Sequence, residues 1–448
     1  MSGLPAATPA PPPAGPPSPL APLLKSTSRA DPSLFLRTSP SPFYILVYVD
    51  DMILITADSA ELEHGHYLQQ VLERFDMARG TPQVTPLPVG HHLTPLTSPS
   101  SSHPYAELIG SLIIHTDYAT CLSPLLLAAA PGFLEASWQE SSQILPDGRT
   151  LLYQDVELVT EEGEQGRMPV TLVSLLIPEN NEQQHQQKRA AVILLHSTNK
   201  SKEALLEKQK EIACLGFVAI TCDNRYHGAR ASSPSAYSDA LVKAWRTGQE
   251  MPFLFDPVWD VLRLLDYLTA AHTDIIDCSR IGITGVSLGG MVAWLAAMVD
   301  PRIAAAAPMI GVQCFKWAVD NNCFHARVAS IPHAFNAAAA DMGKSEVDAQ
   351  VVTAVWNRIT PGLLHQFGPR NSLPAICPRP LLILNGESDP RCPVEGLREA
   401  VRRTEEAYSR ARVPHRFEFY AERGVGHEVT DAMWDKTITW MQTHLLAG

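Results

Sequence analysis

Three residues in the second half of the chain have the types and the order needed to attack an acyl carbon. Ser287 lies in a Gly-x-Ser-x-Gly pattern between Gly285 and Gly289, and Asp389 and His427 follow it along the chain. A histidine that removes the proton of a serine hydroxyl makes that oxygen a nucleophile, and an acid orients the histidine. The three residues therefore predict nucleophilic catalysis by a serine.

The residues around Ser287 predict the backbone that such a serine requires. Apolar, strand-forming residues at 281–284 run into the glycine-rich turn at 285–289, and good helix formers follow at 291–298. A serine in so sharp a turn between strand and helix has a strained backbone, and glycines two residues away remove the Cβ atoms that would clash. Its hydroxyl is expected above the sheet, at the positive N-terminus of the helix.

Asp389 and His427 are each expected in a loop that directly follows a strand, because apolar, strand-forming residues precede both. Ligands bind beyond the carboxyl ends of parallel strands, so the side chains are expected to meet there. Glu387 is the second candidate for the acid. His415 is the second histidine near this region, but it precedes the strand that His427 follows and so lies at its wrong end.

The composition restricts the classes of protein. The 448 residues are 45% hydrophobic and 18% charged, which is enough to bury one or two large cores. A formal net charge of -12 argues against a nucleic-acid-binding protein, because such proteins are basic. No apolar run is long enough to span a bilayer. The eight cysteines include no CxxC pair, so they predict reduced thiols in a cytoplasmic compartment and no zinc site.

The N-terminal segment, residues 1–42, is rich in proline, alanine and serine. Such a segment buries too little apolar surface to order itself, so it is expected to be disordered. Lys25, Arg29 and Arg37 are basic and the first acidic residue is Asp31, which leaves a chloroplast transit peptide as an alternative.

Residues 43–115 form a segment of a different kind. Two β-rich runs flank the adjacent acids Asp50 and Asp51, which is a hairpin pattern with carboxylates at its tip. The sequence Tyr-Val-Asp-Asp at 48–51 resembles the active-site hairpin of reverse transcriptases, and later pieces resemble the copia-type retrotransposon enzyme. Two-metal phosphoryl transfer needs a further carboxylate from an earlier strand, and Asp31 is the one acid before Asp50. The segment is therefore interpreted as a truncated remnant without polymerase activity.

The larger unit is expected over residues 131–448. Two strand runs around an acidic turn at 161–164 predict an antiparallel hairpin at the edge of a sheet, and strands alternate with helices from residue 191 onward. Such alternation implies right-handed crossovers and a mostly parallel central sheet with helices on both faces. The fold class is therefore α/β.

An insertion at about 312–378 interrupts this alternation with helical stretches and four aromatic residues, Phe315, Trp317, Phe324 and Trp356. Its place after a strand predicts a helical cap over the site. Two roles are open for the aromatic side chains. They line an apolar acyl pocket, or they pack the cap against the core.

Five short motifs in the larger unit carry a family resemblance. They are Leu-His-Ser-Thr-Asn-Lys at 195–200, Asn-Arg-Tyr-His-Gly at 224–228, Gly-Val-Ser-Leu-Gly-Gly at 285–290, Asp-Pro-Arg-Cys-Pro at 389–393 and Gly-His at 426–427. Together they resemble a plant-type α/β-hydrolase of the dienelactone hydrolase and acyl-peptidase branch, which implies the α/β-hydrolase fold and a serine esterase. Many relatives have glycine where this chain has Ser197, whose side chain could narrow the oxyanion hole.

In this scheme the serine attacks the acyl carbon, the histidine is the general base and the acid holds the imidazole. The oxyanion of the tetrahedral intermediate needs N–H donors already in place, for which we expect the backbone amide of Leu288 and that of Ser197 or Thr198. This chemistry needs no metal and no cofactor. Residues expected to contact substrate are His196, Tyr226, His227, Phe315 and Trp317. Tyr226 and His227 could instead hydrogen-bond within their own loop.

The predicted function is hydrolysis of a carboxylic ester or thioester with a small to medium acyl group, through an acyl-enzyme. A serine peptidase of the acyl-peptidase or dipeptidyl-peptidase type would share these residues, but such relatives usually carry a β-propeller and no propeller repeats occur here. A ligand-binding protein without catalysis is the other alternative, since a fold does not fix a function. The expected partner is a small ester, with neither nucleic acid nor membrane.

Overall fold

The structure is a computed structural model that describes residues 33–37, 43–48, 51–56, 136–176 and 188–446. The chain divides into two compact units, residues 1–101 and 102–448, which are described separately below. The second unit contains the three residues on which the sequence analysis centres.

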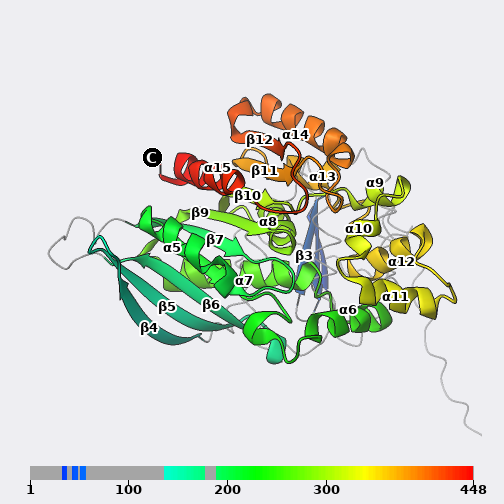
Figure 1. Ribbon diagram of the computed structural model, residues 1–448, viewed down its shortest axis with the longest axis horizontal. Helices are drawn as coiled ribbons and strands as arrows, with labels where there is room; N and C mark the ends of the chain where they lie inside the picture. Colours follow the sequence, from blue (N-terminus) through cyan, green and yellow to red (C-terminus); the bar gives the residue numbers. More distant parts are fainter. Residues whose placement is uncertain (1–32, 38–42, 49–50, 57–135, 177–187, 447–448) are drawn as a thin grey trace, which may run out of the picture. The chain divides into compact units, whose positions relative to one another are not determined.

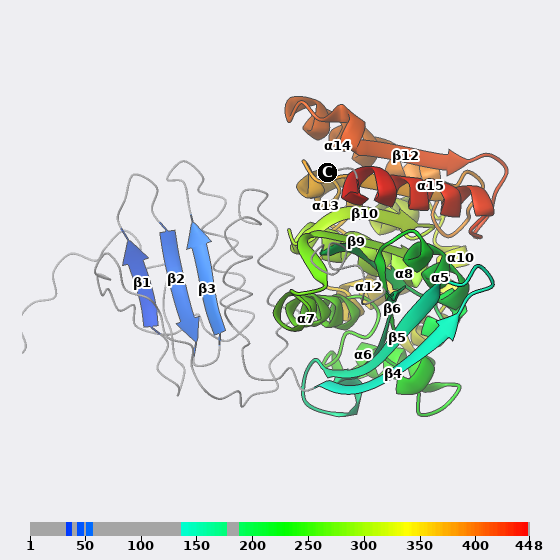
Figure 2. The ribbon, with the colours of Figure 1, turned by 90° about the vertical axis from the view of Figure 1, so that its left-hand side faces the viewer.

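The first unit contains a small antiparallel sheet with strand order β1-β2-β3 (Figure 2). Its strands are β1 (Ser33–Arg37), β2 (Phe43–Tyr48) and β3 (Asp51–Thr56). Tyr48 pairs with Asp51, which confirms the predicted hairpin around the acidic pair. β1 lies within the segment expected to be disordered, and its Leu-Phe-Leu sequence at 34–36 accounts for a strand there. Residues 49–50, the rest of 1–42 and the later pieces of the reverse-transcriptase-like segment lie outside the described residues.

The second unit is built on a nine-stranded sheet with the order β12-β11-β10-β9-β7-β8-β6-β5-β4 (Figure 1). The strands from β7 to β12 run parallel to one another. The remaining pairs are antiparallel, namely β6 with β8, β5 with β6, and β4 with β5. The strands are β4 (Ala136–Ile144), β5 (Thr150–Val159), β6 (Arg167–Leu175), β7 (Arg189–Leu195), β8 (Val218–Cys222), β9 (Ile276–Val286), β10 (Ile303–Met309), β11 (Leu381–Gly386) and β12 (Phe417–Glu422).

Helices cover both faces of this sheet. On one face, α5 and α15 pack in a core with the alternate β7 side chains Val192 and Leu194, while α7, α8 and α14 pack with Ile193 and Leu195 on the other. The two cores follow from the two-residue period of a strand whose faces are both buried. The helices outside the cap, including α6 beside it, have the following bounds: α5 (Leu206–Cys214), α6 (Ala236–Thr247), α7 (Phe255–Ala271), α8 (Leu288–Val299), α14 (Arg398–Arg410) and α15 (Asp431–Met441).

The predicted cap is present and helical. Its helices are α9 (Phe315–Asp320), α10 (His325–Val328), α11 (Pro332–Asp341), α12 (Ala349–Ile359) and α13 (Pro369–Ser372). Figure 1 shows α9 to α12 grouped together on one side of the sheet. Phe315, Phe324 and Trp356 are 2%, 3% and 1% exposed, and Trp356 contacts the rings of Phe253, Phe315 and Phe335. Of the two open roles, these aromatic side chains therefore take the packing role.

The mostly parallel sheet with helices on both faces confirms the predicted α/β class, and the strand expected at 281–284 lies within β9, which begins at Ile276. The hairpin of β5 and β6 is antiparallel as expected but lies one strand inside the edge, because β4 pairs outside it. The sequence pattern does not predict β4, whose residues 139–143 are polar and exposed and so lack the apolar alternation of a core strand.

Among the described residues, no helix combines the length and the apolar character that crossing a membrane requires. The cysteines in the same residues form no disulfide with one another.

Candidate active site

Ser287 lies in a strained turn between β9 and α8. Its backbone has φ 54° and ψ -106°, in the left-handed half of the map that a residue with a Cβ rarely adopts. A Cβ atom on Gly285 would lie 2.4 Å from the carbonyl oxygen of Gly289, and one on Gly289 would lie 2.2 Å from that of Leu195. Both glycines are therefore required for the strand and helix to approach so closely, as the sequence predicts.

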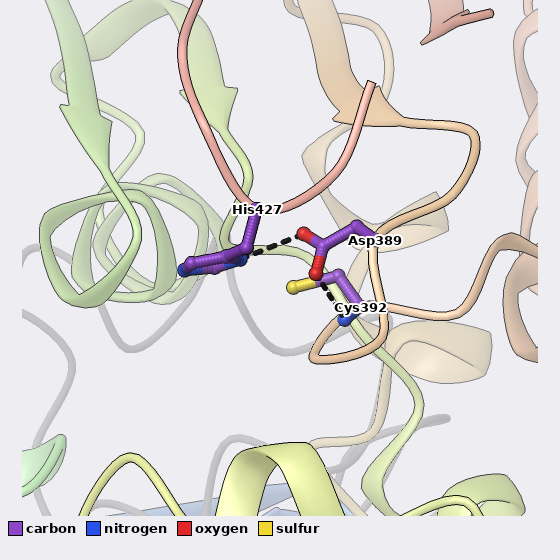
Figure 3. Close-up of side chains that lie close together, drawn as sticks. All are labelled: Asp389, Cys392 and His427. Atoms are coloured by element: carbon purple, nitrogen blue, oxygen red, sulfur yellow. Dashed lines mark hydrogen bonds and ion pairs between the residues drawn. The ribbon is translucent and has the colours of Figure 1, made fainter. Parts of the chain in front are cut away.

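The structure joins Ser287, His427 and Asp389 in one hydrogen-bonded chain. Oγ of Ser287 lies 2.8 Å from Nε2 of His427, and Nδ1 of His427 lies 2.7 Å from Oδ2 of Asp389. Figure 3 shows the Asp389 carboxylate pointing toward the imidazole. Since an ionised carboxylate can only accept, Nδ1 carries the proton and Nε2 is free to accept from the serine hydroxyl. The three residues predicted from the sequence therefore meet beyond the carboxyl ends of β9, β11 and β12.

Asp389 is 2% exposed and its second oxygen is also occupied. Oδ1 accepts hydrogen bonds from the backbone N–H groups of Arg391, at 2.8 Å, and Cys392, at 3.2 Å. Burial by itself would raise the pKa of Asp389, but the hydrogen bond from His427 and these amides bring that pKa below its usual value. The carboxylate is thus ionised and fixed in orientation.

The protonation state of the His427 imidazole allows it to accept a proton. Burial lowers the pKa of its imidazole, and the neighbouring Asp389, which acts in the opposite direction, does not fully offset the effect. The ring is therefore neutral at physiological pH, and a neutral Nε2 facing the Ser287 hydroxyl can take its proton.

The alternative acid and histidine lie elsewhere. Glu387 is exposed, and its carboxylate accepts a hydrogen bond of 3.2 Å from the backbone N–H of Gly424. His415 is exposed at the start of β12, at the opposite end of that strand from His427. Neither residue contacts the hydrogen-bonded chain.

The loop after β7 lies against the N-terminus of α8. A Cβ atom on Gly289 would lie 2.8 Å from the carbonyl oxygen of His196 and 2.2 Å from that of Leu195, so the backbone at 195–196 passes the first turn of that helix. The first amides of a helix have no partner within it, and Leu288 occupies the first helical position. This is the region in which the sequence analysis expects the amides of Leu288 and of Ser197 or Thr198 to act together.

Three residues expected to contact substrate form hydrogen bonds within their own loops or to a neighbouring loop. In buried His196, Nδ1 lies 2.9 Å from the carbonyl oxygen of Ser197 and Nε2 accepts from the backbone N–H of Asn224 at 3.0 Å. Burial lowers the pKa of His196 to about 4, so the ring is neutral. The phenol of Tyr226 donates to Glu250, and Nδ1 of His227 lies 2.8 Å from the carbonyl oxygen of Arg225.

A cavity of about 660 Å³ opens beside this loop. Thr198, Tyr226 and His227 line it from the carboxyl ends of β7 and β8, and residues 330–333 line it from the cap. Nε2 of His227 is buried and makes no hydrogen bond to any described residue. Tyr226 and His227 thus line a cavity, but Ser287 is not among its lining residues, so their contact with substrate stays a prediction.

Phe315 and Trp317, also expected to contact substrate, do not line that cavity. Phe315 is buried in the aromatic cluster of the cap, and the ring of Trp317 packs 2.9 Å from the Cβ position of Gly396. The apolar residues of the insertion therefore stabilise the cap, whereas the cavity has a mixed lining rich in hydroxyl groups.

Asp389, Cys392 and His427 offer oxygen, sulfur and nitrogen atoms within 4.8 Å of one another, a set that zinc can use. All three are engaged without a metal, because Asp389 and His427 bond each other and the Cys392 thiol donates to the carbonyl oxygen of Ile310 at 3.3 Å. Nη2 of Arg327 also lies 3.6 Å from the Cys392 sulfur, and its positive charge opposes a cation there. The donor set therefore fits a hydrogen-bonded site better than a metal site.

Comparison with known proteins finds a family model and solved structures that are similar to parts of this chain. Residues 164–338 match a family model described as glucuronyl esterase, fungi. No curated protein matches the chain. Among solved structures, an acetyl xylan esterase from Thermoanaerobacterium sp. is similar at a TM-score of 0.50 and 14% identity, over 73% of this chain and 92% of that one. An acetyl xylan esterase from Paenibacillus sp. R4 has a TM-score of 0.47 and 17% identity, over 74% and 93%.

The second unit has the α/β-hydrolase fold, as the motifs predict. The family match lies within this unit and agrees with the predicted enzyme class, a carboxylic ester hydrolase. It does not reach residues 42–115, so the resemblance of that segment to a reverse transcriptase stays a prediction.

The structure also brings a residue to the site that the sequence analysis missed. Arg327 belongs to α10 in the cap, and its guanidinium reaches Cys392 on the loop of Asp389. No motif surrounds Arg327, and the 65 positions that separate it from Cys392 give no signal in a single sequence.

Proposed function

We propose that the chain is a serine esterase in which Ser287 attacks the acyl carbon of a carboxylic ester. The observation that carries the proposal is the chain of two hydrogen bonds, 2.8 Å from Ser287 to His427 and 2.7 Å from His427 to Asp389. The strained backbone of Ser287 and the burial of Asp389 support it, since both fix the reacting groups before substrate arrives.

The steps follow from the protonation states. Nε2 of His427 takes the Ser287 proton as Oγ attacks, and the imidazolium that forms is stabilised by the Asp389 carboxylate. Backbone amides of Leu288 and of Ser197 or Thr198 bind the oxyanion, and one such donor lowers the barrier by about 3 kcal/mol. His427 then protonates the leaving alkoxide, and a water molecule activated in the same way releases the acid from the acyl-enzyme.

The choice of substrates to test draws on the names of the matched proteins. The family model names a glucuronyl esterase and the matched structures name acetyl xylan esterases. The cavity of about 660 Å³ next to the loop of Thr198 is lined mainly by small and hydroxyl-bearing residues, but Ser287, Asp389 and His427 are not among them, so it does not define the acyl group.

The test is hydrolysis of p-nitrophenyl acetate by the full chain and by Ser287→Ala. We expect the variant to lose about 10⁴- to 10⁶-fold in kcat, because the nucleophile is gone. Ser279→Ala, which changes an exposed serine near the start of β9, is the matched control and should keep the full rate. Equal rates for Ser287→Ala and the unaltered protein would overturn the assignment of the nucleophile. Methyl glucuronate, acetylated xylan and a peptide p-nitroanilide, run in parallel, distinguish the ester classes and the peptidase alternative.

A further inference from the structure

The cap carries a buried cation next to the candidate active site. Arg327 is 4% exposed, and among the described residues no carboxylate lies within ion-pair distance of its guanidinium. Nε donates to the side-chain oxygen of Gln313 at 3.3 Å, and Nη2 reaches the sulfur of Cys392 at 3.6 Å. A buried arginine without a direct acidic partner is costly, so its surroundings must offset the charge in another way.

The groups that offset the charge belong to the loop of the acid. Burial lowers the pKa of Arg327, and the groups that raise it are Cys392 and Asp389. The guanidinium nevertheless stays protonated, since the pKa of arginine lies far above neutral pH. Asp389 therefore bonds His427 directly and, without an ion pair to Arg327, raises the pKa of that guanidinium.

Cys392 connects Arg327 to the loop that holds Asp389. Its backbone N–H donates to Oδ1 of Asp389 at 3.2 Å, and its thiol donates to the carbonyl oxygen of Ile310 at 3.3 Å while the sulfur receives the hydrogen bond from Arg327. Burial raises the pKa of the thiol to about 12, so the thiol keeps the proton that it donates. One side chain thus joins the cap, the acid loop and the end of β10.

The end of β10 in turn contacts the nucleophile. The backbone N–H of Ser287 donates to the carbonyl oxygen of Met309 at 2.9 Å, directly before Ile310. Ile310 has φ 43°, which is strained for a β-branched residue and persists only where its neighbours hold it. The contacts of Cys392 and Arg327 therefore extend to both the acid and the nucleophile.

We propose that Arg327 is a positioning residue for the site: through the thiol of Cys392 it holds the Asp389 loop and Ile310 in place, so that the cap and the reacting groups form one unit. This inference rests on the proposed function, because it assigns Arg327 a role in the reaction of Ser287. The residue touches neither the nucleophile nor the imidazole and acts through its neighbours.

Because Arg327 is charged, its role predicts a change in the pKa of His427 that a purely structural role does not. The charged groups that act on the pKa of His427 are Asp389, which raises it, and Arg327 and Arg391, which lower it. The thiol of Cys392, the remaining titratable group at this point, is neutral. Removing the positive charge of Arg327 should therefore raise the pKa of His427 and move the acidic limb of the rate profile to higher pH.

The experiment compares variants of the full chain on p-nitrophenyl acetate. Arg327→Met is expected to lower kcat about 10- to 100-fold through misplacement of the acid and to move the acidic limb of kcat/KM upward. Arg327→Lys keeps the charge and should leave the limb in place while recovering part of kcat. Arg379→Met is the matched control, because that partly buried arginine bonds backbone carbonyls at the other end of β10 and should change neither kcat nor the limb.

A folded Arg327→Met variant with the original kcat and an unmoved limb would overturn the proposal. If that variant does not fold, Cys392→Ala tests the proposal instead, because it removes the thiol that Arg327 contacts with a small change of side-chain volume. Its kcat should fall about tenfold and Cys392→Ser should recover most of it, whereas an unchanged kcat in Cys392→Ala would overturn the proposal.

A second readout separates this proposal from the proposed function. The proton between His427 and Asp389 is expected to give a low-field NMR resonance whose pH titration requires no turnover. If the unaltered protein hydrolyses no ester, the proposed function fails, while a resonance that titrates at higher pH in Arg327→Met still supports positioning. An identical titration in both proteins would overturn it.

Discussion

Oγ of Ser287 and Nε2 of His427 lie 2.8 Å apart, although the two residues are 140 positions apart in the chain. Ser287 follows β9 and His427 follows β12, and β10 and β11 lie between these strands in the sheet. All four strands are parallel, so their carboxyl ends share one edge, and loops of different length can reach across it. The testable consequences of this arrangement concern the proton, the acid, the turn and the buried histidines.

The rate of ester hydrolysis should rise with pH through the pKa of His427 and then level off. Only the neutral imidazole can accept the Ser287 proton, and burial lowers its pKa below that of an ordinary histidine, about 6.5. The protein should therefore stay active at a more acidic pH than an exposed histidine would allow. Measurement of kcat/KM for p-nitrophenyl acetate between pH 4.5 and 9 checks this, and a rate that still climbs from pH 7 to 8 would contradict it.

Asp389→Asn should lower kcat about 10⁴-fold and leave KM nearly unchanged, because an amide does not hold the imidazole in the tautomer that Asp389 selects. The measurement is steady-state hydrolysis with circular dichroism as a check on folding. Glu387→Gln is the matched control, since Glu387 is exposed and bonds the Gly424 amide. If Glu387→Gln lost activity and Asp389→Asn kept it, the role of the acid would belong to Glu387.

Gly289→Ala should disrupt the turn that presents Ser287. The added Cβ would lie 2.2 Å from the carbonyl oxygen of Leu195, a backbone atom that cannot move aside cheaply. We expect a loss of about 1–3 kcal/mol in the free energy of unfolding, as for other overpacked sites, together with a loss of activity. Urea unfolding measures the first. Gly368→Ala, where the new Cβ finds its nearest atom at 3.4 Å, should be tolerated, and equal stability of both variants would count against the tight turn.

Two buried histidines should make the folded state sensitive to acid. Burial lowers the pKa of His196 and His227 to about 4, against about 6.5 in the unfolded chain. Between these values the unfolded chain binds protons that the folded protein does not, so each histidine lowers the free energy of unfolding as pH falls, by about 3 kcal/mol per histidine once the pH is below both values.

His227→Asn should remove one of these protons and flatten the dependence of the free energy of unfolding on pH, as measured by urea unfolding at pH 7, 6 and 5. Comparison with the unaltered protein is needed because Asp256, whose pKa burial raises to about 6, acts in the opposite direction. His415→Asn changes an exposed histidine and should leave the dependence as it was. Parallel curves for all three proteins would refute the prediction.

Most of the parallel sheet and the three central residues could be predicted because their signals are local. The turn at 285–289 carries its glycines within two residues of Ser287, and an apolar run precedes the short loop that carries Asp389 and the one that carries His427. β4 could not be predicted in this way, since an exposed edge strand needs no apolar face. Nor could the role of the cap aromatics, because a buried and a pocket-lining side chain have the same composition.

The sequence by itself therefore determined the α/β class, from the alternation of strand and helix runs, the strained turn at Ser287, from its two glycines, and the order of serine, acid and histidine, from the strand that precedes each. The tertiary structure alone decided the hydrogen bonds among the three, the position of Glu387, the second candidate for the acid, beside Gly424 and away from His427, and the contact of Arg327 with Cys392. These depend on side chains that the parallel crossovers bring to one edge of the sheet, and distances across such an edge leave no local pattern in the sequence.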